Sequence, residues 1–150
     1  MRLSAIDRKI LNNIQKNFPV CIRPYRVIGE RLGLTEDEVI NKIKELNKSG
    51  VICRFGVSVN HKKLGYYSTL IAVKVSSERI KETADEITAY PEVTHCFIRE
   101  GEYNLWFVYI TTKKQKIENL LKNLSRRLGK KNILNLVTRK KLKLETDLKL

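Results

Sequence analysis

The stretch PEVTHCFIREGEYNLWF, residues 91–107, is the most informative part of this 150-residue chain for predicting its fold. It contains two apolar runs that are separated by the turn-forming residues Gly101 and Asn104. Short apolar runs on either side of turn residues predict two strands that meet in a hairpin, here at 93–99 and 104–111. The other elements of the C-terminal half can be placed around this hairpin.

The first of these strands carries an unusual set of side chains. Side chains alternate between the two faces of a strand, so His95, Phe97 and Arg99 are expected to share one face. Cys96 then lies on the opposite face, where it is expected to be a small buried hydrophobic residue. A proton donor and a permanent cation on one face form a candidate site for binding a carboxylate.

The residues around the hairpin predict two further strands and two helices. Apolar residues are spaced as in strands at 66–75 and 133–142, and as in amphipathic helices before Pro91 and between Lys113 and Gly129. The resulting order, β-α-β-β-α-β, is that of a ferredoxin-like sandwich in the α+β class.

The N-terminal part of the chain has the pattern of three short helices. Two capping boxes, Ser4 with Asp7 and Thr35 with Glu38, predict where the first and the third helix begin. Pro24 suits the first turn of the helix between them. Three helices in this order predict a helix-turn-helix.

A strand at 51–59 is expected to follow the third helix, in the position of a wing. The apolar pattern is interrupted near residues 60–66, which predicts a domain boundary there. We therefore expect a winged helix-turn-helix domain with its linking strand at 1–62. An α/β sandwich domain is expected at 63–150.

The composition argues against several classes of protein. The three cysteines, Cys21, Cys53 and Cys96, are odd in number and far apart, which argues against a disulfide framework and predicts a cytoplasmic location. Only two histidines are present, so we expect no dedicated metal site. The chain contains no run of about 18 apolar residues, and no membrane-spanning helix is expected.

The net charge of +14 is concentrated in the C-terminal part. Residues 113–143 hold 12 Lys and Arg and one acid, a balance of +11, whereas residues 23–50 have a balance of +1. The third predicted helix begins with the acids Glu36, Asp37 and Glu38, where a DNA reader would approach phosphates. DNA binding is therefore not expected of this domain, although it stays the alternative.

The whole chain resembles the Lrp/AsnC regulators. This resemblance is carried by AIDRKILNNIQ (5–15), IGERLGLTEDEVINKIKELNKSGVI (28–52) and HKKLGY (61–66). It implies a helix-turn-helix followed by a ligand-sensing α/β domain. The alternative function is accordingly a DNA-binding transcription regulator that responds to a small molecule.

A more specific resemblance is to the siroheme decarboxylases, which use the same fold for an enzyme. The segments that carry it are FP (18–19), RPY (23–25), LGYYSTL (64–70), YPEVTH (90–95), RE (99–100) and YNLWF (103–107). The resemblance implies removal of CO2 from two acetate side chains of siroheme, giving 12,18-didecarboxysiroheme in haem biosynthesis. It also implies a homodimer or a heterodimer with a related beta-type subunit. Gly101 is a departure, because a histidine is expected at that position.

The resemblance implies no separate cofactor, because siroheme brings its own iron and its conjugated macrocycle accepts the electron pair. His95 would deliver a proton or bind the iron, and Tyr103 is the second candidate proton donor. Four other residues would bind substrate. These are Arg99, Trp106, Arg23 and Tyr25.

Plainer interpretations of these residues stay open. Arg99 can pair with Glu100 or Glu102 instead of a substrate. Trp106 and Phe107 lie on opposite faces of their strand, so at least one of them is expected in the core. If Arg99 does bind substrate, its truncation is expected to weaken the binding of siroheme more than that of the decarboxylated product.

Overall fold

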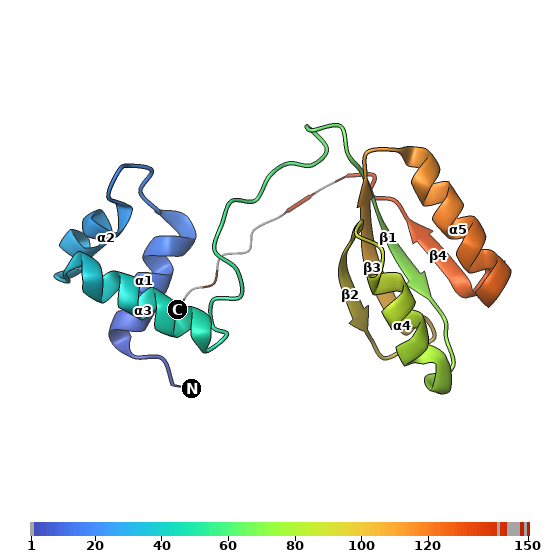
Figure 1. Ribbon diagram of the computed structural model, residues 1–150, viewed down its shortest axis with the longest axis horizontal. Coiled ribbons are helices and arrows are strands. Elements are labelled where there is room, and N and C mark those ends of the chain that lie inside the picture. Colours follow the sequence, from blue (N-terminus) through green and yellow to red (C-terminus); the bar gives the residue numbers. More distant parts are fainter. Residues whose placement is uncertain (1, 141, 144–147, 149) are drawn as a thin grey trace. The chain divides into compact units, whose positions relative to one another are not determined.

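The computed structural model describes residues 2–140, 142–143, 148 and 150. The chain divides into a helical unit, residues 1–58 with 143–150, and an α/β unit, residues 59–142 (Figure 1). The C-terminal residues are grouped with the helical unit because Leu148 exchanges two hydrogen bonds with Gln15, of 2.9 and 3.3 Å. Among the described residues, no helix is long and apolar enough to cross a membrane.

The helical unit contains the three predicted helices, α1 (Ala5–Lys16), α2 (Pro24–Leu32) and α3 (Glu36–Lys48). Both capping boxes are present and start α1 and α3 as expected. Helix α2 begins at Pro24 and ends at Gly33, whose φ of 70° is the left-handed conformation that glycine adopts without strain. The buried apolar residues of this unit come from all three helices. They include Ile10, Leu11, Ile28, Val39 and Leu46.

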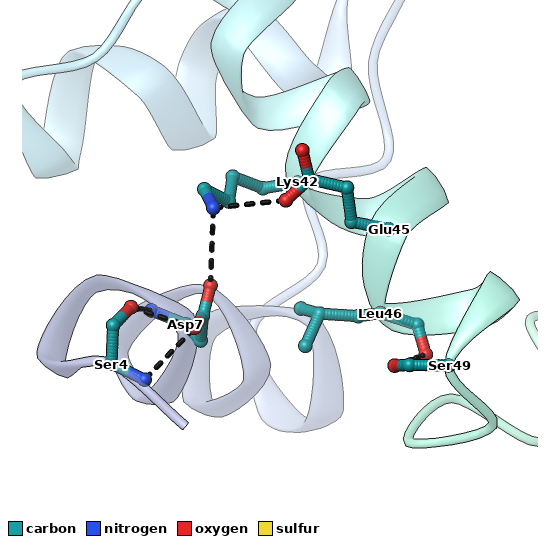
Figure 2. Close-up of polar contacts among 6 residues, drawn as sticks. All are labelled: Ser4, Asp7, Lys42, Glu45, Leu46 and Ser49. Carbon is teal, nitrogen blue, oxygen red and sulfur yellow. Dashed lines mark hydrogen bonds and ion pairs between the residues drawn. The ribbon is translucent and has the colours of Figure 1, made fainter. Parts of the chain in front are cut away.

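Figure 2 shows the polar contacts that join α1 to α3. The carboxylate of Asp7 accepts hydrogen bonds from the main-chain N–H and the hydroxyl of Ser4, at 2.9 and 2.6 Å. The Lys42 ammonium group lies 3.9 Å from this carboxylate and 2.9 Å from that of Glu45. These contacts lower the pKa of Asp7, chiefly through the hydrogen bonds from Ser4.

The prediction of a strand at 51–59 is wrong, because this segment has an irregular conformation. No strand of the described chain pairs with it, and a single strand has no partner for its main-chain hydrogen bonds. Its apolar residues are partly used by the helical unit instead. The ring of Phe55 contacts that of Phe18, with 5.2 Å between the centroids, whereas Val57 is exposed.

The α/β unit has the predicted order of strands and helices. Its elements are β1 (Tyr67–Val73), the 3-10 turn η1 (Ser77–Arg79), α4 (Ile80–Thr88), β2 (Val93–Ile98), β3 (Leu105–Thr111), α5 (Lys114–Leu128), the 3-10 turn η2 (Lys130–Asn132) and β4 (Ile133–Leu136). The four strands form one antiparallel sheet in the order β2-β3-β1-β4. The last strand is shorter than the sequence predicts.

Helices α4 and α5 pack on one face of the sheet and form its core. That core includes Ile87 of α4, Leu120 of α5 and Phe107 of β3. The opposite face, called the open face below, carries the alternate residues of the four strands. They are Ser68, Leu70 and Ala72 of β1, His95 and Phe97 of β2, Trp106, Val108 and Ile110 of β3, and Leu134 and Leu136 of β4. None of these residues belongs to the core under the helices.

Candidate functional site

His95 and Phe97 of β2, and Arg99 directly after the end of that strand, lie in one exposed row, as the alternation predicts. The imidazole of His95 is stacked on the Phe97 ring, with 6.1 Å between the centroids and 30° between the planes. The guanidinium carbon of Arg99 lies 5.7 Å from the same centroid, within the range of a cation–π contact. The three side chains are therefore in contact along the strand.

A bulge at the start of β2 places Val93 and His95 on different faces of the sheet. Val93 pairs with Tyr109, but His95 pairs with Val108, so the pairing shifts between these two positions of β2. In a regular strand Val93 and His95 would share a face. With the extra residue, Val93 packs against the core while His95 is exposed.

The ring nitrogens of His95 have different surroundings. Nδ1 lies 3.0 Å from the hydroxyl oxygen of Thr94. Nε2 has no hydrogen-bond partner among the described residues, so it is the ring nitrogen that is available to a ligand. A partner on one ring nitrogen sets which tautomer is present and orients the ring.

Arg99 has no carboxylate partner among the described residues. Glu102, one of the two acids that were considered as partners of Arg99, instead accepts a hydrogen bond from Lys74 at 3.0 Å. Arg99 is exposed, so its guanidinium group can still bind a carboxylate in bidentate fashion.

Trp106 and Phe107 divide between the two faces of β3 as predicted. Phe107 is fully buried in the core, with an exposed fraction of 0%. Trp106 lies on the open face, where it is the register partner of Phe97. Its indole N–H donates to the main-chain oxygen of Tyr103 at 2.6 Å, so the ring is held by the hairpin turn.

Tyr103 and Asn104 hold that turn in place. The Tyr103 hydroxyl donates a hydrogen bond to the main-chain oxygen of Lys131 at 3.1 Å. A catalytic tyrosine would have to transfer the same proton to the substrate. The Asn104 side chain accepts from the N–H of Val75 at 3.0 Å and donates to its oxygen at 2.7 Å. Asn104 therefore ties the turn to the end of β1.

Arg23 and Tyr25, the remaining expected substrate contacts, belong to the helical unit. Arg23 forms an ion pair with Glu36 at the start of α3. The ring of Tyr25 meets that of Phe18 edge to face, with 6.0 Å between the centroids. Each of the two residues thus has a partner within its own unit.

Cys96, beside the row, and His61, elsewhere in the α/β unit, add neither a nucleophile nor a metal site. Burial raises the pKa of the Cys96 thiol, which favours the unreactive neutral form. His61, the second histidine, has its Nε2 2.9 Å from the Ser68 hydroxyl. Among the described residues, no group of three or more His, Cys, Asp and Glu is placed to hold a metal ion.

Two features of the site were not assigned a role from the sequence. Alternation alone identifies Phe97 as a neighbour of His95 and Arg99, but not as a ring in contact with both. The role of Thr94 depends on the bulge, and no sequence signal predicts the position of that bulge.

Each of the two units matches a known protein family. Residues 7–52 match the siroheme decarboxylase NirDL-like HTH domain, and residues 63–143 match the AsnC-like ligand binding domain. The siroheme decarboxylase alpha subunits of Desulfovibrio desulfuricans and Nitratidesulfovibrio vulgaris are 36% and 38% identical to the chain over 148 residues. These alignments cover 99% of the chain and 85% and 84% of the relatives.

The chain is also similar to a solved structure of a siroheme decarboxylase. The siroheme decarboxylase NirDL in co-complex with an iron-uroporphyrin III analogue is 30% identical, with a TM-score of 0.66. The match covers 85% of this chain and 42% of that one. The chain therefore belongs to the siroheme decarboxylase family.

Proposed function

We propose that the chain is a siroheme decarboxylase subunit, a carboxy-lyase that removes CO2 from two acetate side chains of siroheme to give 12,18-didecarboxysiroheme. The observation that carries the proposal is the row of His95, Phe97 and Arg99 on the open face, in a chain 36–38% identical to such subunits over 99% of its length.

Each decarboxylation breaks the bond between an acetate methylene carbon and its carboxylate. The electron pair of that bond passes into the conjugated macrocycle, CO2 leaves, and a proton is added to the carbon. The macrocycle is an electron sink, so we propose that no separate organic cofactor takes part and that the iron enters with the substrate.

His95 is the proposed proton donor. Its Nε2 is the ring nitrogen without a partner in the described chain, and Thr94 orients the ring through Nδ1. The alternative, in which Nε2 binds the siroheme iron, uses the same geometry. Tyr103 remains a second candidate donor, but its hydroxyl must first leave the oxygen of Lys131.

Arg99 and the aromatic rings bind the substrate. Siroheme carries eight carboxylates, and the Arg99 guanidinium group can bind one of them. Phe97 and Trp106 are register partners on adjacent strands, and together they offer an aromatic surface to the macrocycle. Arg23 and Tyr25 are left as lesser candidates because each already has a partner in the helical unit.

We propose that the active form contains two subunits, as a homodimer or with a related beta-type subunit. The open face supports this, because Leu70, Val108, Ile110, Leu134 and Leu136 form an apolar surface that the helices do not cover. Light scattering on the chain alone, and mixed with a beta-type subunit, distinguishes the two assemblies. A strictly monomeric active enzyme would contradict both.

The test of function is anaerobic incubation of the folded protein with siroheme, with the partner subunit added where it is needed. We expect a shifted Soret band on binding and a product lighter by two CO2 in the mass spectrum. Binding without loss of mass would indicate a tetrapyrrole sensor. The absence of both effects would reject the proposal.

A further inference from the structure

We infer that the row His95–Phe97–Arg99 binds two different carboxylate arms of one substrate, so that the carboxylate held by Arg99 is not the one lost near His95. Phe97 is the positioning residue that sets the distance between the two ends of the row. This inference rests on the proposed function and specifies which substrate groups the site distinguishes.

The distances place the two functional groups far apart. His95 and Arg99 lie two residues before and two residues after Phe97, which is roughly 6.6 Å in each direction along an extended strand. The observed separations of 6.1 Å and 5.7 Å from the Phe97 centroid agree with this spacing. Imidazole and guanidinium therefore lie on either side of Phe97 along the chain, with about 12 Å as the upper limit of their separation.

At the upper limit of this separation, one acetate arm is too short to reach both groups. A hydrogen bond extends about 3 Å from each of the two side chains, and the remaining gap is then longer than an acetate. The proton from His95 must reach the carbon that bore the leaving carboxylate. In this extended arrangement of the row, Arg99 holds another carboxylate of the same molecule.

The chemistry of the reaction favours the same division. The negative charge of the leaving carboxylate disappears from it in the transition state, as the electron pair moves into the macrocycle. An arginine bound to that carboxylate would stabilise the ground state more than the transition state and would slow the reaction. An arginine bound to a carboxylate that stays in place adds affinity without this cost.

The row therefore fits a polycarboxylate with a flat apolar body and carboxylates on separated edges. Phe97 is 51% exposed, so its ring edge and part of its face are available to such a body. Siroheme has eight carboxylates and the doubly decarboxylated product keeps six. The carboxylate bound by Arg99 is then present in both.

The first test compares Arg99→Ala with the wild-type chain by Soret titration against siroheme and against the didecarboxylated product. We expect both dissociation constants to rise by about 10-fold or more, with the two rises equal within about 2-fold, in contrast to the larger loss for siroheme that was expected from the sequence. A loss confined to siroheme would place Arg99 on the leaving carboxylate and overturn the inference.

The second test is a double-mutant cycle with Phe97→Ala. If Phe97 positions Arg99, the Arg99→Ala penalty should shrink by about 2- to 5-fold in the Phe97→Ala background, and Phe97→Tyr should restore it. Ile98→Ala is the matched control, because Ile98 is the next residue of β2 and is also an exposed apolar side chain. Purely additive effects would reject the positioning role.

These outcomes are separate from a failure of the proposed function. If the wild-type protein neither binds nor decarboxylates siroheme, the function and the inference fail together. If wild-type turnover is normal but the Arg99→Ala penalty is specific for substrate, only the inference fails.

Discussion

Arg23 of the helical unit and Arg99 of the α/β unit show how differently the two units treat a cation. Arg23 is paired with Glu36 at the start of α3, whereas Arg99 lies over an aromatic ring without a carboxylate partner in the described chain. An ion pair satisfied within the fold is not available to a ligand without cost. Arg23 is therefore used within the helical unit, whereas Arg99 is left available for a ligand.

A similar contrast holds between the residues that begin and join the N-terminal helices and the row of β2. Asp7 and Glu38 are engaged in capping boxes, and Lys42 joins two carboxylates. In the α/β unit the Nε2 of His95 and the guanidinium group of Arg99 remain available. The helix-turn-helix is thus well built as a scaffold, while the candidate chemistry lies on the sheet.

The largest effect is expected for His95→Ala. Loss of a positioned general acid should reduce turnover by about 100-fold or more. The side chain is exposed, so the free energy of unfolding should change little. Single-turnover assays with siroheme and denaturant unfolding measure the two effects. The matched control is His61→Ala, and a loss of turnover as large as that of His95→Ala would move the catalytic role to His61.

The next largest effect separates the two arginines. Arg99→Ala should weaken siroheme binding by about 10-fold or more, because it removes charge-assisted hydrogen bonds. Arg23→Ala should change the dissociation constant by less than about 2-fold, since its partner is Glu36. Equal losses in the Soret titration would show that the helical unit also binds the tetrapyrrole.

A smaller effect on stability is expected for Asp7→Asn, which weakens a capping box and should cost about 1 kcal/mol. Hydrogen exchange should show faster opening of α1 and unchanged protection of β1 and β3. A loss of protection in the sheet would contradict the description of two separate units.

The pH dependence of the same contact follows from the pKa of Asp7, which the Ser4 hydrogen bonds lower in the folded chain. The stabilisation is fully present above the unfolded-state pKa of about 4, and it is lost as pH falls through the lower folded-state pKa. Asp7→Asn should remove this part of the acid-induced loss of stability. An unchanged acid titration would show that Asp7 is not responsible.

A still smaller effect is expected for Tyr103→Phe. Removing the hydroxyl bond to Lys131 should cost roughly 0.5–1.5 kcal/mol of stability and leave turnover nearly unchanged. A drop in turnover comparable to that of His95→Ala would restore Tyr103 as a proton donor.

The smallest effect concerns DNA. Glu36 and Glu38 are held at the start of α3 by Arg23 and by the capping box, and Asp37 is exposed beside them. We expect Lys44→Ala and Lys48→Ala in α3 to leave the salt dependence of binding to random duplex DNA unchanged. A slope reduced by about one for each variant would assign phosphate contacts to α3 and favour the regulator.

Elements that are specified by neighbouring residues could be predicted from the amino-acid sequence. The capping boxes of Ser4 with Asp7 and Thr35 with Glu38 join residues three apart, so they could be recognised and were confirmed. The alternation that puts His95, Phe97 and Arg99 on one face is likewise local. The hairpin and the β-α-β-β-α-β order followed from the same kind of pattern.

Features that join distant parts of the chain could not be predicted and became visible in the folded structure. The bulge before His95 depends on pairing with β3, and the contacts of Tyr103 with Lys131 and of Asn104 with Val75 span 28 and 29 residues. The prediction of a strand at 51–59 was wrong because residues with strand propensity form a strand only where a partner strand is available. Local sequence patterns specify on which face of a strand a side chain lies. Packing between distant segments specifies which residues that side chain contacts.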